Sequence, residues 1–91
     1  NPLTAYFFAL GMVRDGRERE AAESLNNALL YNPEPELRAE IYFQLGNLSF
    51  KRGQYGEAYR YFRRTLDLVP DHGMAQFNAS VCIRELRQDP P

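Results

Sequence analysis

Residues 39–70 decide the fold of this chain, and they read AEIYFQLGNLSFKRGQYGEAYRYFRRTLDLVP. Apolar side chains recur in this stretch at intervals of three and four residues, which is the spacing of one face of an α-helix. Gly53 interrupts the pattern near its middle, and Pro70, which cannot continue a helix, closes it. The stretch therefore predicts a helical hairpin, two helices joined by a tight glycine turn.

The same landmarks occur earlier in the chain, displaced by 37 residues. The matched positions are Gly16 with Gly53, Glu20-Ala21 with Glu57-Ala58, Leu29 with Leu66 and Pro33 with Pro70. A turn glycine, a closely packed alanine, a core leucine and a helix-ending proline are the residues that define a helical hairpin. The self-match therefore predicts another hairpin, which lies N-terminal to the one at residues 39–70.

A further helix is expected after Pro70. We predict Asp71 as its N-cap, because a carboxylate accepts a free backbone N–H at a helix start, and the segment Asp89-Pro90-Pro91 as its end. No stretch alternates with a period of two, so no strand is expected. The five expected helices are residues 2–15, 18–32, 36–52, 55–69 and 71–88.

The composition is that of an ordinary globular chain, with 44% hydrophobic and 25% charged residues among 91. This length predicts a single domain, residues 1–91. The net charge of −1 offers no basis for binding a phosphate backbone, so nucleic acid is not an expected partner. No apolar run approaches the roughly 20 residues that cross a bilayer, so membrane insertion is not expected. The apolar opening stretch, residues 3–13, is predicted to form a buried helix.

No pattern predicts catalysis, a metal or a cofactor. The chain has no Ser/His/Asp order and no phosphate-binding loop, so an enzyme is not expected. His72 has no second histidine near it and is predicted to be a solvated turn residue. Cys82 is the single cysteine and is predicted to be a small buried thiol, which fits a reducing compartment and favours the cytoplasm.

A cluster of arginines marks the helix predicted at residues 55–69. Arg60, Arg63 and Arg64 lie within one turn of each other, with Glu57 and Asp67 at helical spacing from them. Such acids neutralise a basic cluster, so we interpret it as a solvated face.

Residues 39–70 resemble a tetratricopeptide repeat, a helix-turn-helix unit of 34 residues. The resemblance rests on Ala39-Glu40, Tyr42, Leu45-Gly46-Asn47, Lys51, Gly53, Tyr55, Glu57-Ala58, Tyr61, Leu66, Leu68 and Pro70. The first unit is similar but weaker, keeping Gly16, Ala21, Leu25, Ala28 and Pro33, with Ala9 where the second unit has Gly46. We place the three extra residues of its 37-residue offset in the connector at residues 33–37.

The final helix returns to the family period, because Phe43 matches Phe77 and Gly46 matches Ser80 after 34 residues. The resemblance thus implies an all-α fold, two helix-turn-helix hairpins and a C-terminal capping helix in an α-α superhelix of five helices. The implied units are residues 1–35, residues 36–70 and the cap at residues 71–88. Small residues belong where helices cross closely, so Gly46 is expected to face Ala58.

The resemblance also implies function, because tetratricopeptide repeats are generally binding scaffolds in which the first helix of each unit lines a concave groove. The implied groove residues are Tyr6, Leu10, Val13, Phe43, Gln44, Asn47, Phe50, Lys51, Phe77, Asn78, Val81 and Arg84. Tyr6, Phe43 and Phe77 would form an aromatic row, which suits a protein or peptide with hydrophobic anchors. The alternative is that these aromatic side chains belong to the core.

Groove asparagines in this family often hold the backbone of a bound peptide, which is the role implied for Asn47 and Asn78; the alternative is that they are ordinary exposed amides. A clamp for chaperone C-termini is not expected, because Tyr6, Leu10 and Phe43 replace its polar residues. A second hypothesis is structural: the chain is a self-associating unit or a segment of a longer solenoid, and another copy or a neighbouring domain fills the groove.

Overall fold

The computed structural model describes residues 1–88, so the helix end expected at Asp89-Pro90-Pro91 lies outside the described residues. Within residues 1–88 the chain forms five α-helices and no strand, which confirms the all-α prediction. They are α1 (Pro2–Arg14), α2 (Glu18–Leu29), α3 (Pro35–Lys51), α4 (Tyr55–Leu68) and α5 (Gly73–Gln88).

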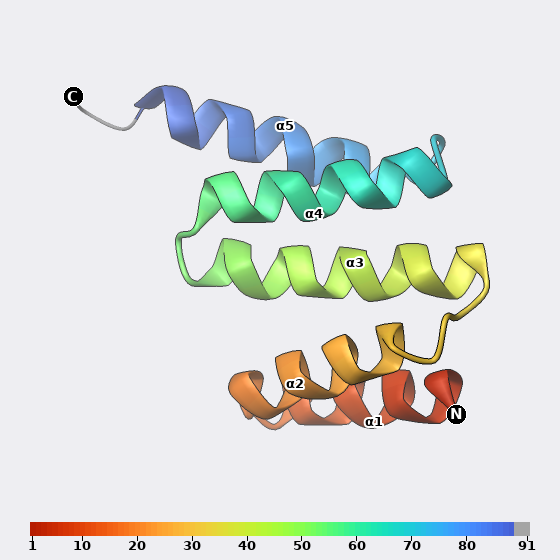
Figure 1. The fold of residues 1–91 in the computed structure, drawn as a ribbon. Helices are drawn as coiled ribbons and strands as arrows, with labels where there is room; N and C mark the ends of the chain where they lie inside the picture. The colour runs from red at the N-terminus through yellow and green to blue at the C-terminus, as the bar shows by residue number, and fades with distance from the viewer. Residues whose placement is uncertain (89–91) are drawn as a thin grey trace.

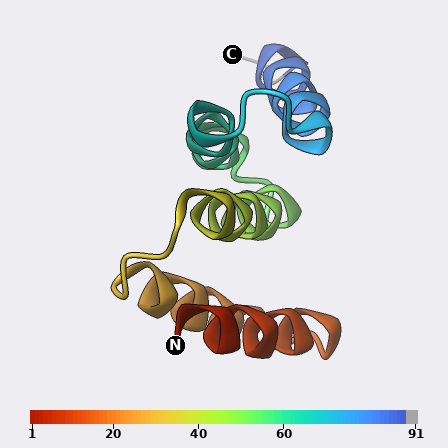
Figure 2. The ribbon, with the colours of Figure 1, turned by 90° about the vertical axis from the view of Figure 1, so that its right-hand side faces the viewer.

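The helices stack in chain order into an elongated body of 43 × 28 × 18 Å, with α1 and α5 at opposite ends of the stack (Figure 1). Helices α1, α3 and α5 run in the same direction (Figure 1). Seen along the helices, α1, α3 and α5 lie towards one side and α2 and α4 towards the other (Figure 2). Three parallel helices therefore share one side of the molecule.

The two hairpins turn in the same way, as the 37-residue self-match predicts. Gly16 and Gly53 have φ of 79° and 77°, a left-handed conformation that glycine adopts without steric cost. The N–H after each glycine bonds back five residues, from Arg17 to Met12 O at 2.8 Å and from Gln54 to Ser49 O at 3.0 Å. These residue pairs are themselves 37 positions apart, so the repeat extends to individual backbone hydrogen bonds.

Helix α2 ends at Leu29, three residues before the expected end at residue 32. The next N–H groups, of residues 30–32, bond to the carbonyls three residues back, and Asn32 then takes a left-handed φ of 51°. This tightened turn ends the regular helix before Pro33. Helix α3 begins at Pro35, so its first turn takes up much of the segment that we expected to be a connector.

Two apolar clusters hold the stack together. The first joins the α1–α2 hairpin to α3 and contains Ala9, Ala21, Leu25, Ala28, Ile41, Leu45 and Leu48. The second joins α3, α4 and α5 and contains Phe43, Ala58, Phe62, Ala75, Ala79 and Cys82. Helix α3 contributes to both clusters, so it is the element that connects the two halves of the molecule.

Gly46 does mark a close helix crossing, but its partner is not Ala58. A Cβ atom added at Gly46 would meet three ring atoms of Phe62 at 2.6–3.0 Å. The ring of Phe62 therefore occupies the space that we assigned to Ala58, because the aromatic side chain reaches from α4 to the backbone of α3.

The prediction that the opening stretch is a buried helix is wrong. Ala9 is the only buried residue of α1, while Leu3, Phe7 and Phe8 have 49%, 61% and 63% of their surface exposed. Helix α1 lies at one end of the stack, so its neighbours in residues 1–88 cover only part of its circumference (Figure 2).

Candidate partner-binding groove

The residues expected to line the groove differ widely in exposure. The half-buried ones are Tyr6, Leu10, Val13, Gln44, Asn47, Phe50, Asn78 and Val81. Lys51, Phe77 and Arg84 are exposed, and Phe43 is buried. All of them come from α1, α3 and α5, the three parallel helices.

Phe43 is not available to a partner. Only 7% of its surface is exposed, and its ring lies 5.8 Å from that of Phe62 and 4.7 Å from that of His72. For Phe43 the core interpretation is therefore correct, and the expected aromatic row through Tyr6, Phe43 and Phe77 is interrupted at its centre. The start of α5 causes this burial. Ala75 belongs to the same apolar cluster as Phe43, and the ring of His72 lies against the ring of Phe43.

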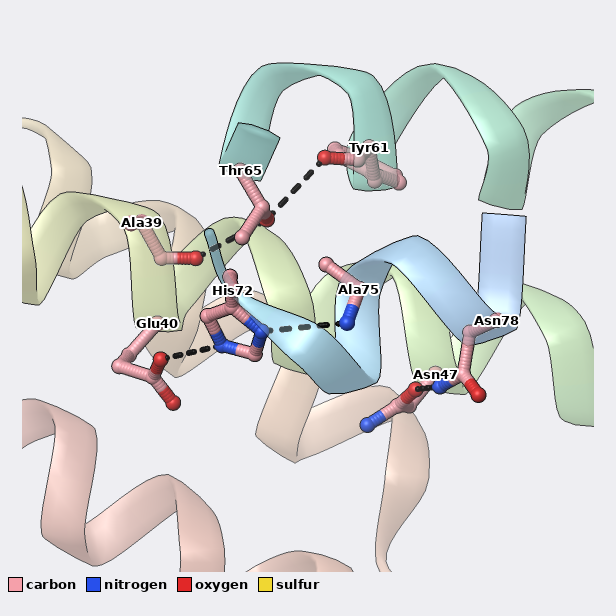
Figure 3. A network of polar contacts seen from close by, with 8 residues as sticks. All are labelled: Ala39, Glu40, Asn47, Tyr61, Thr65, His72, Ala75 and Asn78. Carbon is pink, nitrogen blue, oxygen red and sulfur yellow. Dashed lines mark hydrogen bonds and ion pairs between the residues drawn. The ribbon is translucent and has the colours of Figure 1, made fainter. Parts of the chain in front are cut away.

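Asn47 and Asn78 meet across α3 and α5. The Asn78 side chain donates a hydrogen bond from Nδ2 to Oδ1 of Asn47 at 3.1 Å. Figure 3 shows the remaining polar atoms, Nδ2 of Asn47 and Oδ1 of Asn78, pointing away from this bond. The pair therefore links two helices and presents one amide donor and one carbonyl acceptor, on opposite sides of the hydrogen bond (Figure 3).

His72 is not a solvated turn residue, and it takes the capping role that we expected of Asp71. Nδ1 of His72 accepts a hydrogen bond from the backbone N–H of Ala75 at 3.1 Å, while Nε2 lies 2.7 Å from Oε2 of Glu40 (Figure 3). The side chain of His72 is only 14% exposed. Nδ1 must be unprotonated to accept, so Nε2 carries the proton that is donated to Glu40.

The sequence signal for this role is the position of His72 directly before Gly73, the first residue of α5. An acceptor side chain at the N-cap reaches the N–H two or three residues on. We missed it because the expected start of the helix was two residues too early.

Tyr6 packs against α3. Burial raises its pKa above the ordinary 10.0, the negative charge of Glu40 raises it further, and a hydrogen bond with Gln44 opposes the shift. Tyr6 also meets Phe7 edge-on, with ring centroids 5.6 Å apart. The phenol therefore stands between α1 and α3 as a mostly neutral, half-buried group.

Of the two cations expected in the groove, Lys51 is already paired. Its Nζ lies 2.6 Å from Oε2 of Glu18, at the start of α2. Arg84 is exposed and has no ion pair within residues 1–88. The expected groove residues therefore offer little positive charge to an anionic partner.

The arginine cluster of α4 is only partly neutralised by acids. Arg63 pairs with Asp67 at 3.7 Å. Arg64 instead lies over the ring of Tyr42, 5.5 Å from its centroid, and that ring stacks on Tyr61. The cluster thus contributes to helix packing as well as to the solvated face.

Other candidate chemistry is limited in the part of the chain that the structure describes. Cys82 is buried, and burial raises the pKa of its thiol. Across residues 1–88, no three His, Cys, Asp or Glu side chains gather as metal ligands would. None of the helices α1 to α5 combines the length and apolar character needed to cross a membrane.

Met74, an exposed apolar residue near the start of α5, was missed by the sequence reasoning. Met74 is 63% exposed and Phe77 is 67% exposed, and they lie three residues apart, on one face of the helix. Met74 completes a spacing of three and four with Phe77, Asn78 and Val81, which is the signal that could have identified it.

The family model of the tetratricopeptide repeat matches residues 39–72, from the first half of α3 to His72, the residue directly before α5. A search of curated proteins gave no match. The matched segment contains most of the α3–α4 hairpin, with its left-handed Gly53 and the close contact of Gly46 with Phe62. Repeats of this kind generally build protein-interaction scaffolds. Residues 39–72 therefore form a tetratricopeptide repeat.

Proposed function

We propose that this protein binds a protein or peptide with hydrophobic anchors on the face formed by α1, α3 and α5. One observation carries the proposal: Phe77, two-thirds exposed, adjoins the hydrogen-bonded pair of Asn47 and Asn78. An apolar anchor site thus lies beside polar groups that can orient a backbone.

The apolar part of the site centres on α5. Met74 and Phe77 expose most of their surface, and half-buried Val81 follows one turn later. Aromatic side chains contribute strongly to interface energies because they bury a large area at little entropic cost. Met adapts its shape to irregular partner surfaces. The three side chains together suit an apolar anchor residue of a partner.

The polar part of the site can orient the backbone of a bound peptide. The free Nδ2 of Asn47 can donate to a peptide C=O, and the free Oδ1 of Asn78 can accept from a peptide N–H. An extended peptide presents such a donor and acceptor along its edge. The bond between the two asparagines holds both amides in place, which lowers the entropy lost on binding.

The charges argue against an acidic ligand as the main anchor. Lys51 is held by Glu18, and Glu40 contributes negative charge next to His72 and Tyr6. A carboxylate-clamping groove needs several free cations on one face. We therefore propose apolar anchors as the main determinant, in line with the expectation from the sequence.

The test compares Phe77→Glu with Leu30→Glu, a matched control at a residue that is 81% exposed and lies outside the groove. Partners captured from a cell extract by the unaltered protein are identified, re-expressed and titrated by calorimetry. We expect Phe77→Glu to weaken binding at least about tenfold, the effect of losing roughly 1.4 kcal/mol, and Leu30→Glu to leave it unchanged. Equal affinities for both variants, with unaltered thermal unfolding, would refute the groove.

Self-association through the same groove is the second candidate, and the exposed Met74 and Phe77 favour it because apolar patches seldom stay bare. Sedimentation at increasing concentration distinguishes the two. A dimer that Phe77→Glu dissociates identifies a second copy as the occupant, whereas a monomer at all concentrations identifies a separate partner. Phe43→Glu is unsuitable for this purpose because Phe43 is buried.

A further inference from the structure

We propose that the face formed by α1, α3 and α5 carries a cation-binding site centred on Glu40, called the Glu40 site below, and that its ligand is an arginine side chain of the bound protein or peptide. This inference rests on the function proposed above and adds a second determinant of the partner to the apolar anchor. Glu40 lies on α3 two turns before Asn47, so both side chains leave the helix on the same face.

Glu40 keeps its negative charge although it contacts His72. Nδ1 of His72 accepts the backbone N–H of Ala75 at 3.1 Å, so this nitrogen carries no proton and the ring is neutral. Nε2 donates to Oε2 of Glu40 at 2.7 Å. The start of α5 adds only the partial charge of a helix N-terminus, about half an elementary charge. The carboxylate is therefore hydrogen-bonded without being neutralised.

The carboxylate of Glu40 is also accessible. The side chain is 41% exposed, and the oxygen that does not bind His72 points away from the imidazole ring (Figure 3). Within residues 1–88 no lysine or arginine pairs with Glu40. A cation from a partner can thus reach the second oxygen while the bond with His72 stays in place.

The side chains near Glu40 favour a guanidinium group. Burial and, after it, the negative charge of Glu40 raise the pKa of the Tyr6 phenol, which hydrogen-bonds Gln44, so the aromatic ring lies close to the carboxylate. A guanidinium group can donate to a carboxylate and also lie on an aromatic ring, and it suits such a site better than an ammonium group. A metal ion would need more ligating side chains than the described residues gather here.

The internal repeat adds an apolar setting. The positions equivalent to Glu40 are Leu3, 37 residues earlier, and Met74, 34 residues later. Leu3 is 49% and Met74 is 63% exposed, so the acid is particular to the second unit and stands in a row of exposed apolar side chains. An arginine side chain matches this row, because its methylene groups can cover apolar surface while its charged end reaches the carboxylate.

The distance along α3 predicts a spacing in the partner. Glu40 and Asn47 are seven residues apart, which is about 10 Å along a helix. An extended peptide advances about 3.3 Å per residue. The arginine is therefore expected about three residues from the residue whose backbone contacts the pair of Asn47 and Asn78.

The test begins with a displayed library of random dodecapeptides, selected on the whole chain. Selected sequences are synthesised with a fluorescent label, once with arginine and once with citrulline, its uncharged isostere. Affinities for the protein variants are measured by fluorescence anisotropy, and thermal unfolding verifies the fold of each variant.

The protein variants remove one charge each. Glu40→Gln keeps an oxygen that can accept from His72. Glu57→Gln is the matched control, since Glu57 is an exposed acid on α4, which lies towards the other side of the molecule (Figure 2). Phe77→Glu reports on the proposed groove itself.

We expect the selected peptides to carry an apolar anchor and an arginine at the predicted spacing. Citrulline should weaken binding to the unaltered protein and to Glu57→Gln at least about tenfold. Glu40→Gln should weaken binding of the arginine peptide by a similar factor, and citrulline should then cause little further loss, because both changes remove the same interaction.

The possible failures are distinguishable. Peptides that need Phe77 but bind Glu40→Gln with unchanged affinity would overturn the Glu40 site and leave the groove intact. An equal loss of the arginine and citrulline peptides on Glu40→Gln would assign Glu40 a structural role only. Peptides that bind Phe77→Glu as tightly as the unaltered protein, or a library without binders, would refute the groove and the Glu40 site with it.

Discussion

The ring of Phe62 in α4 lies directly against the backbone of Gly46 in α3, so close that a Cβ atom at position 46 would stand 2.6 Å from Cε1 of the ring. Phe62 is fully buried and also contacts Phe43. This contact sets how closely the two helices of the matched repeat approach. A ring held by its neighbours has little room to move away from an added methyl group.

Gly46→Ala should therefore destabilise the protein, by about 1–3 kcal/mol, because the strain of overpacking outweighs the better helix propensity of alanine. The matched control is Gly11→Ala in α1, where an added Cβ meets nothing within 4 Å. We expect that change to stabilise the protein by up to about 1 kcal/mol. Urea unfolding measures both; a stabilising Gly46→Ala would show that the contact is not rigid.

Replacement of His72 should loosen the start of α5. His72→Ala removes both the cap on the Ala75 N–H and the contact with Glu40, and we expect a loss of about 1–2 kcal/mol in unfolding free energy. His72→Asn keeps an acceptor at the N-cap and should lose less. Equal destabilisation by the two variants in chemical denaturation would argue against the capping role.

Thr65 joins α4 to α3 through a buried hydroxyl group. Its Oγ1 donates to the carbonyl of Ala39 at 3.1 Å, with the carbonyl of Tyr61 at 3.3 Å as a second acceptor (Figure 3). Thr65→Val keeps the shape and removes the donor, so we expect a loss of about 0.5–1.5 kcal/mol. Thr4→Val, the same change at an exposed residue, should alter unfolding by less than about 0.5 kcal/mol.

Tyr6 should make stability fall at alkaline pH. Its pKa in the folded protein is raised above the ordinary 10.0, chiefly by burial, so the neutral phenol is favoured in the fold. The resulting stabilisation is complete below the pKa of the unfolded chain and is lost as the pH rises through the folded-state pKa.

Tyr6→Phe should consequently lose less stability than the unaltered protein between about pH 9 and pH 11. Thermal unfolding midpoints across that range provide the measurement, and Tyr31→Phe, at an exposed tyrosine, is the control. If the Tyr6→Phe and Tyr31→Phe proteins lose stability in parallel, burial of the Tyr6 phenol is not the cause.

Both hairpins were predictable because their signals are local. Gly16 and Gly53 each take a left-handed conformation that other residues rarely adopt, so their positions define the turns without knowledge of the rest of the fold. The end of α2 was placed too late because Asn32, which also adopts a left-handed φ, is a weaker signal than glycine.

The accessibility of the expected groove residues was less predictable, because it depends on contacts between residues far apart in the sequence. Phe43 and Phe77 occupy equivalent positions in two units, yet one is buried and the other is two-thirds exposed. The difference arises because His72, at the start of α5, covers Phe43, whereas none of the described residues covers Phe77 to the same extent. Equivalence in sequence thus does not imply equal accessibility.

The sequence by itself determined the all-α architecture and the two glycine turns of this protein, because helical periodicity, left-handed glycines and helix-ending prolines act over a few residues. Only the tertiary structure decided which side chains the candidate site residues contact. Asn47 meets Asn78, 31 residues apart, and His72 meets Glu40, 32 residues apart. Such pairs depend on how α5 crosses α3 and α4, and that crossing results from packing of the whole cluster around Phe43 and Phe62.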